Sequence, residues 1–209
     1  MAIFKGGVDG PISGLVGTVI CYKVGDVTYA RGKIRPRAAD SWSEKQVLHR
    51  RRISSVGSMY KSMAKNPARA SWRKASGLSP GFSLFLKTNI GAFNSDGSEV
   101  DLEYLHLSTG EVPLPHQLKA AVTADDSEWW EVAWLDDSGK GLAKLDDELL
   151  VMVVRDGKFS DLISTGAKRG DQSAFIELPV GEGTVQGIYL SFASADRSSF
   201  SMDAFFAAV

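Results

Sequence analysis

The residues with the most recognisable catalytic spacing are Gly77, Ser79 and Gly81, which form a Gly-x-Ser-x-Gly pattern. In a nucleophile elbow, this pattern exposes the serine on a sharp turn, and the backbone N–H of the next residue stabilises the oxyanion. The next residue here is Pro80, which has no backbone N–H. The pattern therefore predicts a helix start at Ser79-Pro80, and we expect no catalytic serine.

The sequence contains few residues that could bind a metal ion or a cofactor. The three histidines, His49, His106 and His116, are far apart in the chain, and none belongs to a His-x-x-x-His pair. Cys21 is the single cysteine, so neither an intrachain disulfide nor a cysteine metal cluster can form. The glycines of residues 6–17 match neither common phosphate-binding spacing. We expect no metal, no cofactor and no enzymatic activity.

Two further motifs have structural explanations. Residues 169–171 spell Arg-Gly-Asp, a cell-adhesion tripeptide, and we interpret them as a polar turn that enters a strand at 174–178. Trp129 and Trp130 are neighbours on an expected strand, so their side chains point to opposite sides. We expect one of them to join Trp134 in the core and the other to lie on a surface or interface, rather than in a carbohydrate-stacking platform.

The strongest functional signal is an uneven distribution of charge. Residues 1–95 contain 16 Lys and Arg against 4 Asp and Glu, a net charge of +12. Residues 96–209 contain 8 Lys and Arg against 21 Asp and Glu, a net charge of −13. Such a division favours binding to a charged partner or to another copy of the chain.

The basic tract 31–74 supports two readings. Its cations, with Trp42, Tyr60 and Trp72 between them, are suited to a nucleic-acid backbone and its bases. They are equally suited to the acidic half of a neighbouring copy, which we favour. The cations expected to bind a partner or polyanion are Arg31, Lys33, Arg35, Arg37, Arg50, Arg51, Arg52, Lys61, Arg73 and Lys74, and the acids expected to dock them are Asp136, Asp137, Asp146 and Asp147.

The first secondary structure that the sequence predicts is a β-hairpin. Thr18–Tyr22 and Val27–Arg31 are rich in β-branched and aromatic residues and are separated by a short turn. A helix is predicted from Trp42 to about Ala64, because Ser41 and Glu44 match a capping box. Pro67 and Pro80 indicate further helix starts. Residues 94–98 form a turn cluster where the charge changes sign, and there we place a domain boundary.

The second half reads as strands. Leu149–Val154 is an unbroken apolar run between charges and before an Asp-Gly turn, which predicts a strand buried on both faces. The Asp-Asp pairs of the second half recur at the interval of a strand plus a turn, so we interpret them as turns. The other predicted strands are 100–107, 118–123, 128–135, 158–164, 174–178, 185–193 and 200–207.

Two resemblances follow from these residues. Trp134, then Tyr189 in GIYLSFASAD, resembles the fibronectin type III or immunoglobulin-like pattern over about residues 118–209. The chain as a whole resembles an uncharacterised bacterial protein family of about 200 residues, through GPISGLVGTVICYKVGDVTYARGK, KQVLHRRR and AKRGDQSAFIELP. That family has no assigned activity, so the resemblance implies an architecture and no chemistry.

We therefore expect a basic α+β region over residues 1–95, followed by an acidic, fibronectin III/Ig-like antiparallel sandwich over 96–209. The expected function is that of a structural protein that self-associates as a homo-oligomer or docks to another protein, as part of a particle, filament or surface layer. The alternative is nucleic-acid binding through Arg31–Lys74. The N-terminus lacks the apolar run of a signal peptide, and no segment has membrane-span length. We expect cytoplasmic synthesis and no membrane insertion.

Overall fold

The computed structural model describes residues 2–4, 13–34, 42–77, 80–123 and 128–208, and it forms two compact units, Met1–Ser43 and Glu44–Val209. The change of charge sign predicted a division near residue 95. That position lies inside the second unit, where the helices share a core with strands from the C-terminal half of the chain. Charge and packing therefore divide this chain at different places.

The first unit is a small antiparallel sheet in the strand order β1-β4-β3-β2. The predicted hairpin is confirmed as β3 and β4, which pair from Val19↔Gly32 to Val24↔Val27. Among residues 13–34, only Cys21, Thr28 and Ala30 are buried. The strands are β1 (Ala2–Phe4), β2 (Gly14–Val16), β3 (Val19–Val24) and β4 (Val27–Gly32).

The second unit begins with three helices, at the places where the sequence predicted them. The first helix continues into a 3-10 turn, and the second follows Pro67 within one turn. The helices are α1 (Glu44–Ser62), α2 (Arg69–Ala75) and α3 (Gly81–Asn89), with 3-10 turns at Met63–Lys65 (η2) and Ile90–Ala92 (η3). Ser79 lies outside the described residues.

Two antiparallel sheets complete the second unit. One has five strands, in the order β12-β11-β7-β8 with β9 also paired to β7, and the other has three, in the order β10-β6-β5. The strands are β5 (Lys119–Val122), β6 (Trp129–Ala133), β7 (Glu148–Arg155), β8 (Lys158–Phe159), β9 (Ile163–Lys168), β10 (Ser173–Glu177), β11 (Val185–Ala193) and β12 (Ala204–Ala207); a 3-10 turn, η4 (Arg169–Asp171), joins β9 to β10.

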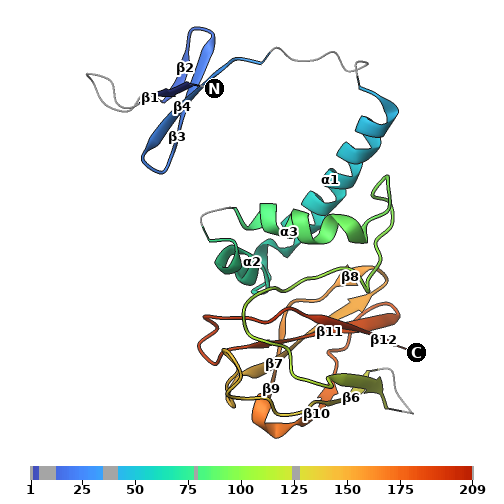
Figure 1. Cartoon of the computed structure of the whole chain (residues 1–209). Helices are drawn as coiled ribbons and strands as arrows, with labels where there is room; N and C mark the ends of the chain where they lie inside the picture. Colours follow the sequence, from blue (N-terminus) through green and yellow to red (C-terminus); the bar gives the residue numbers. More distant parts are fainter. Residues whose placement is uncertain (1, 5–12, 35–41, 78–79, 124–127, 209) are drawn as a thin grey trace. The chain divides into compact units, whose positions relative to one another are not determined.

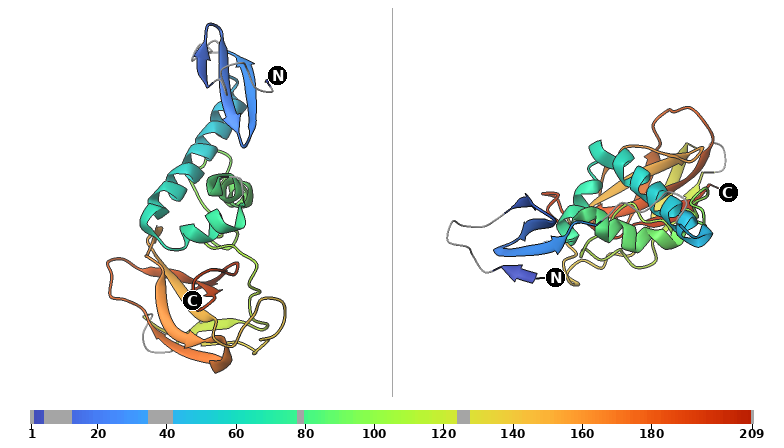
Figure 2. Two further views of the ribbon diagram at one scale, coloured as in Figure 1. Left: turned by 90° about the vertical axis from the view of Figure 1, so that its left-hand side faces the viewer. Right: turned by 90° about the horizontal axis from the view of Figure 1, so that it is seen from above.

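Strand β7 separates two hydrophobic cores, which explains its unbroken apolar sequence. Met152 and Val154 face the helices, whereas Val151 and Val153 face the three-stranded sheet. Because neighbouring side chains on a strand point to opposite faces, both faces must be apolar. The predicted doubly buried strand is confirmed. The second unit thus has three layers, with the helices and the three-stranded sheet on opposite sides of the five-stranded sheet (Figures 1 and 2).

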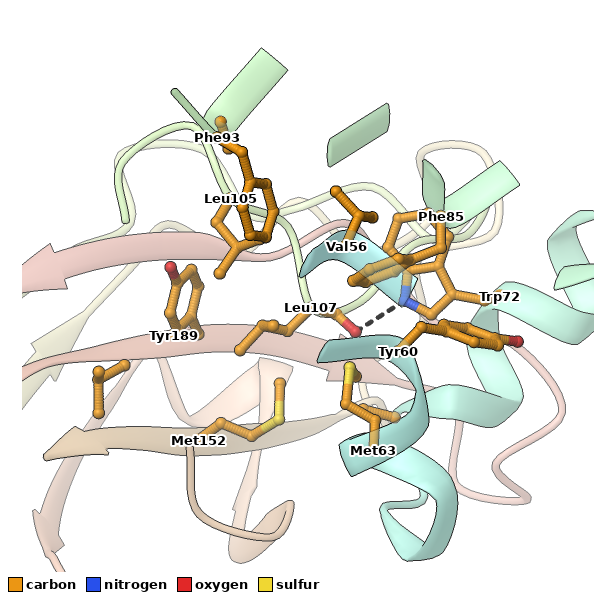
Figure 3. Close-up of a cluster of buried hydrophobic side chains, with 13 residues drawn as sticks. Val56, Tyr60, Met63, Trp72, Phe85, Phe93, Leu105, Leu107, Met152 and Tyr189 are labelled. Atoms are coloured by element: carbon orange, nitrogen blue, oxygen red, sulfur yellow. Dashed lines mark hydrogen bonds between the residues drawn. The ribbon is translucent and has the colours of Figure 1, made fainter. Parts of the chain in front are cut away.

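The helix-side core is built on aromatic side chains (Figure 3). Trp72 is fully buried, packs edge-on against Phe85 at a centroid distance of 5.0 Å, and donates its indole N–H to the carbonyl of Leu107 at 2.8 Å. Tyr189 of β11 reaches into the same core. These contacts attach the helices to the sheet.

The predicted strand at 100–107 is wrong, since the segment is irregular apart from one bridge at Val100. Its backbone binds side chains instead of a neighbouring strand. The amide of Asn89 pairs with both the N–H and the carbonyl of His106, and the Asp203 carboxylate accepts the N–H of Leu107 at 2.6 Å. Alternating apolar residues therefore pack here without a sheet.

The chain is thus a mixed α+β protein with antiparallel sheets. The finer assignment to a fibronectin or immunoglobulin topology stays a prediction.

Candidate functional site

The cations of α1 lie on different sides of the helix, because consecutive helical residues are about 100° apart. Arg50 and Arg51 are exposed, whereas Arg52 is half-buried with its guanidinium 3.5 Å from the carbonyl of Gly91. Lys61 is exposed in the last turn of the helix. The predicted arginine cluster is therefore not a single patch.

Arg51 lines an open groove of about 830 Å³ along α1. The groove contains several serines of α1 and both signs of charge, since Arg51 and Lys158 face Asp96 and Asp161 there. Hydrogen bonds from Ser98 lower the pKa of Asp96, and the nearby Arg51 charge lowers it further. Part of the Arg51 charge is thus compensated within the unit.

The remaining predicted cations are spread over α2 and the first unit. Arg73 and Lys74 are exposed, and the Lys74 ammonium contacts the carbonyl of Arg197. Arg31 and Lys33 are exposed in the N-terminal unit, which is a separate body. Arg35 and Arg37 lie outside the described residues.

The aromatic residues of the basic tract are largely unavailable for stacking on bases. Trp72 has no exposed surface and Tyr60 is 5% exposed. Tyr60 packs against Phe85, with Arg69 over its ring at 4.4 Å. The expectation that these two aromatics interleave with the cations on a binding surface is wrong, because they form the core that holds the helices together.

Two of the four predicted docking acids are buried. Asp137 and Asp147 are 5% and 0% exposed, and both bind the buried Arg169, at 2.6 Å and 3.2 Å. Their docking role is therefore wrong, because the guanidinium already occupies them. Asp136 and Asp146 are exposed. The pairs at 136–137 and 146–147 each contribute one acid to solvent and one to the interior.

Arg169 itself is fully buried within η4. Its guanidinium also donates to the carbonyl of Pro113 at 2.7 Å and lies 4.8 Å from the ring centroid of Phe192. Trp134 donates its indole N–H to the backbone carbonyl of Arg169. The Arg-Gly-Asp tripeptide therefore has its arginine inside the protein, which agrees with the interpretation as a turn.

A second buried carboxylate, that of Asp203, organises the segment after α3. One oxygen accepts the N–H of Leu107 and Ser108, and the other lies 2.9 Å from Nδ1 of His106. The hydrogen bond to Asp203 raises the pKa of His106, although partial burial opposes this. The Asp203 carboxylate thus orients the imidazole of His106, and it also accepts hydrogen bonds from the backbone of Leu107 and Ser108.

The outer face of the three-stranded sheet carries an arrangement that sequence reasoning missed. Trp129 is 41% exposed and Phe175 is 69% exposed, and each lies directly opposite a glutamate on the neighbouring strand. Glu177 is opposite Trp129, and Glu131 is opposite Phe175. The alternation around Trp129 and Glu131 was visible in the sequence, but the register that places β10 beside them was not. One of the two neighbouring tryptophans was expected in the core, and it is Trp130, which is fully buried.

Within the residues that the structure describes, no group of three or more His, Cys, Asp and Glu side chains is arranged to hold a metal ion. The described helices include none that is long and apolar enough to cross a membrane.

Comparison with protein families agrees with the resemblance to an uncharacterised family of about 200 residues. Searches of curated proteins and of solved structures found no match. A family profile matches residues 11–206, which is nearly the whole chain and includes parts of both compact units. The chain therefore belongs to a family of unknown function, DUF6266.

Proposed function

We propose that this chain is a non-enzymatic structural protein that self-associates through oppositely charged surfaces, as a component of a particle, filament or surface layer. The observation that carries the proposal is the separation of charge within the second unit. Residues 44–95, which form the helical layer, contain ten Lys and Arg against one Glu. The three-stranded sheet, on the other side of the five-stranded sheet, exposes Glu131 and Glu177.

Opposite charges on two sides of one rigid unit favour a head-to-tail contact. Such a contact is heterologous, so it closes into a ring or continues as a filament. Complementary charge also steers the approach of two copies and sets their orientation. Asp136 and Asp146, which remain exposed, add to the acidic side.

The N-terminal sheet supports a role in protein contacts. Its exposed side chains include Leu15, Val24 and Ile34, at 57%, 59% and 74%. Apolar side chains that are exposed to water are unfavourable in free energy, and a unit this small cannot bury them all in its own core. Contact with a protein surface would bury them. We infer that it packs on protein in the assembled state.

The sheets of the second unit support a fibronectin-like or immunoglobulin-like sandwich as the finer fold assignment. Trp134 packs edge-on against Phe192 of the penultimate strand β11, at a centroid distance of 5.4 Å. This is the kind of tryptophan–aromatic contact that the resemblance implies, although Tyr189, the aromatic on which the resemblance was based, lies in the helix-side core.

Nucleic-acid binding is the alternative, and burial of Tyr60 and Trp72 removes two of the aromatics that it would use. Charge reversal separates the two functions. Changing Arg50, Arg51 and Arg52 to Glu should abolish both self-association and nucleic-acid binding. Changing Asp136 and Asp146 to Lys should weaken only self-association, because these acids would repel a phosphate backbone.

The measurement is the solution mass of each variant, with and without added DNA or RNA. Asp137 and Asp147 stay unchanged, so that the buried contacts of Arg169 are kept. If the Asp-to-Lys protein assembles as wild type does while wild type binds nucleic acid tightly, the assembly proposal is wrong and the alternative replaces it.

A further inference from the structure

We propose that the outer face of the three-stranded sheet is the acceptor surface for the basic helix α1 of a second copy of this chain. The surface consists of Trp129, Glu131, Phe175 and Glu177, which we call the acceptor face. This inference rests on the proposed self-association and names the residues that receive the neighbouring copy.

The acceptor face has an alternating pattern of aromatic rings and carboxylates. Residues two apart on β6 are Trp129 and Glu131, and residues two apart on β10 are Phe175 and Glu177. The register places each ring opposite a carboxylate, at the roughly 5 Å separation of directly paired strand residues. Each glutamate therefore has one aromatic neighbour across the strands and another along its own strand.

The face is hollowed on its β5 side, next to Glu131. Glu131 lies between Ala121 on β5 and Phe175 on β10. A hollow of about 450 Å³ lies beside Glu131, and its lining consists of Lys119, Ala120, Ala121, Glu131, Ala133 and Phe206. No ion pair joins Glu131 or Glu177 to any other residue in the described ranges.

This pattern fits a guanidinium group better than it fits other ligands. A guanidinium binds a carboxylate through paired N–H groups and stacks on an aromatic face at the same time. The chain already uses this combination internally, where Arg169 binds Asp137 and Asp147 and lies over Phe192. The acceptor face offers the same two chemical groups on the surface, with two negative charges that a carbohydrate ligand does not neutralise.

The occupant is identified by charge and by position. Helix α1 carries five Lys and Arg against one Glu, and Arg50 and Arg51 are exposed. The five-stranded sheet and both hydrophobic cores separate α1 from the acceptor face within one unit. The helix of the same chain therefore cannot reach the face, whereas the helix of a second copy can.

The test uses full-length variants that remove charge without reversing it. The acceptor variant is Glu131→Gln with Glu177→Gln, and the donor variant is Arg50→Gln with Arg51→Gln. All four side chains are exposed, and the melting temperature of each variant is measured beside wild type to show that it is folded. Each variant alone should self-associate with a dissociation constant raised by about tenfold or more in analytical ultracentrifugation.

Mixing the two variants gives the sharper result. The donor variant keeps an intact acceptor face, and the acceptor variant keeps an intact helix, so an equimolar mixture should form 1:1 dimers that do not extend. The matched control is Glu103→Gln with Glu111→Gln, which removes the same charge from exposed positions elsewhere and should assemble as wild type does.

The outcomes separate this inference from the proposed function. If wild type and the acceptor variant assemble equally well, the acceptor face is wrong while self-association stands. Loss of assembly in the control as well as in the acceptor variant shows a general charge effect and also overturns the acceptor face. If wild type does not self-associate at all, the proposed function fails and this inference fails with it.

Discussion

The second unit contains two buried carboxylate sites that differ in the cation they use. Asp137 and Asp147 bind Arg169, which is fully buried and permanently charged. Asp203 binds His106, whose side chain is 28% exposed and whose pKa is raised by the hydrogen bond to Asp203. The first site joins the loops beside the three-stranded sheet, and the second attaches the segment after α3 to the C-terminal segment before β12.

The difference shows how the fold uses acidic residues. At the first site, two carboxylates and a guanidinium depend on one another, because each would be an unpaired buried charge without its partner. At the second, one carboxylate mainly satisfies backbone N–H groups, and the histidine adds to it. The acids of both sites contribute to the net charge calculated from the sequence. Because they are buried and already bound, neither kind is available to a partner.

The largest expected effect is at Arg169. Replacing Arg169 with Met leaves the carboxylates of Asp137 and Asp147 buried without a cation, and should destabilise the second unit by about 3–5 kcal/mol. Chemical denaturation of the full-length protein, followed by tryptophan fluorescence, measures this loss. The variant Arg169→Met with Asp137→Asn and Asp147→Asn should recover part of it. Equal stability of wild type and Arg169→Met would contradict the description of Arg169, Asp137 and Asp147 as a buried set of charges that depend on one another.

A smaller effect is expected at the second site. Replacing Asp203 with Ala removes the acceptor of two buried N–H groups, those of Leu107 and Ser108, and should cost roughly 2–3 kcal/mol. No charge is left buried there, because His106 can become neutral. A loss larger than that of Arg169→Met in the same denaturation experiment would reverse the comparison between the two sites.

The smallest effect is a pH dependence carried by His106. Because its pKa is raised in the folded state, its contribution to stability is complete below the unfolded pKa of about 6.5 and is lost as pH rises through the folded value. Thermal melting between pH 6 and pH 8 should show a stability decrease in wild type that is absent in His106→Asn. If the melting temperature of His106→Asn decreases with pH as steeply as that of wild type, the pH dependence comes from other groups.

Much of the fold could be predicted from the sequence, because local patterns determine it. The run Leu149–Val154 required two apolar faces, and the structure has a core on each. The Asp156-Gly157 turn was visible in the sequence, and both residues adopt the positive φ that such a hairpin turn needs. The helix starts near Pro67 and Pro80 followed from proline chemistry.

The parts that could not be predicted depend on contacts between distant residues. The segment 100–107 alternates like a strand, but Asn89 and Asp203 bind its backbone. Nothing near Asp137 or Asp147 indicates that Arg169 will pair with both. For the same reason, the pairing of β6 with β10, which creates the acceptor face, became visible only in three dimensions.

The central claim is that oppositely charged surfaces make this chain self-associate, and sedimentation velocity tests it most directly. The wild-type chain has a mass of 22.6 kDa. We predict species heavier than this mass at low ionic strength, growing with protein concentration, and a shift towards the monomer as salt screens the charges. A single 22.6 kDa species at every salt and protein concentration would contradict the account.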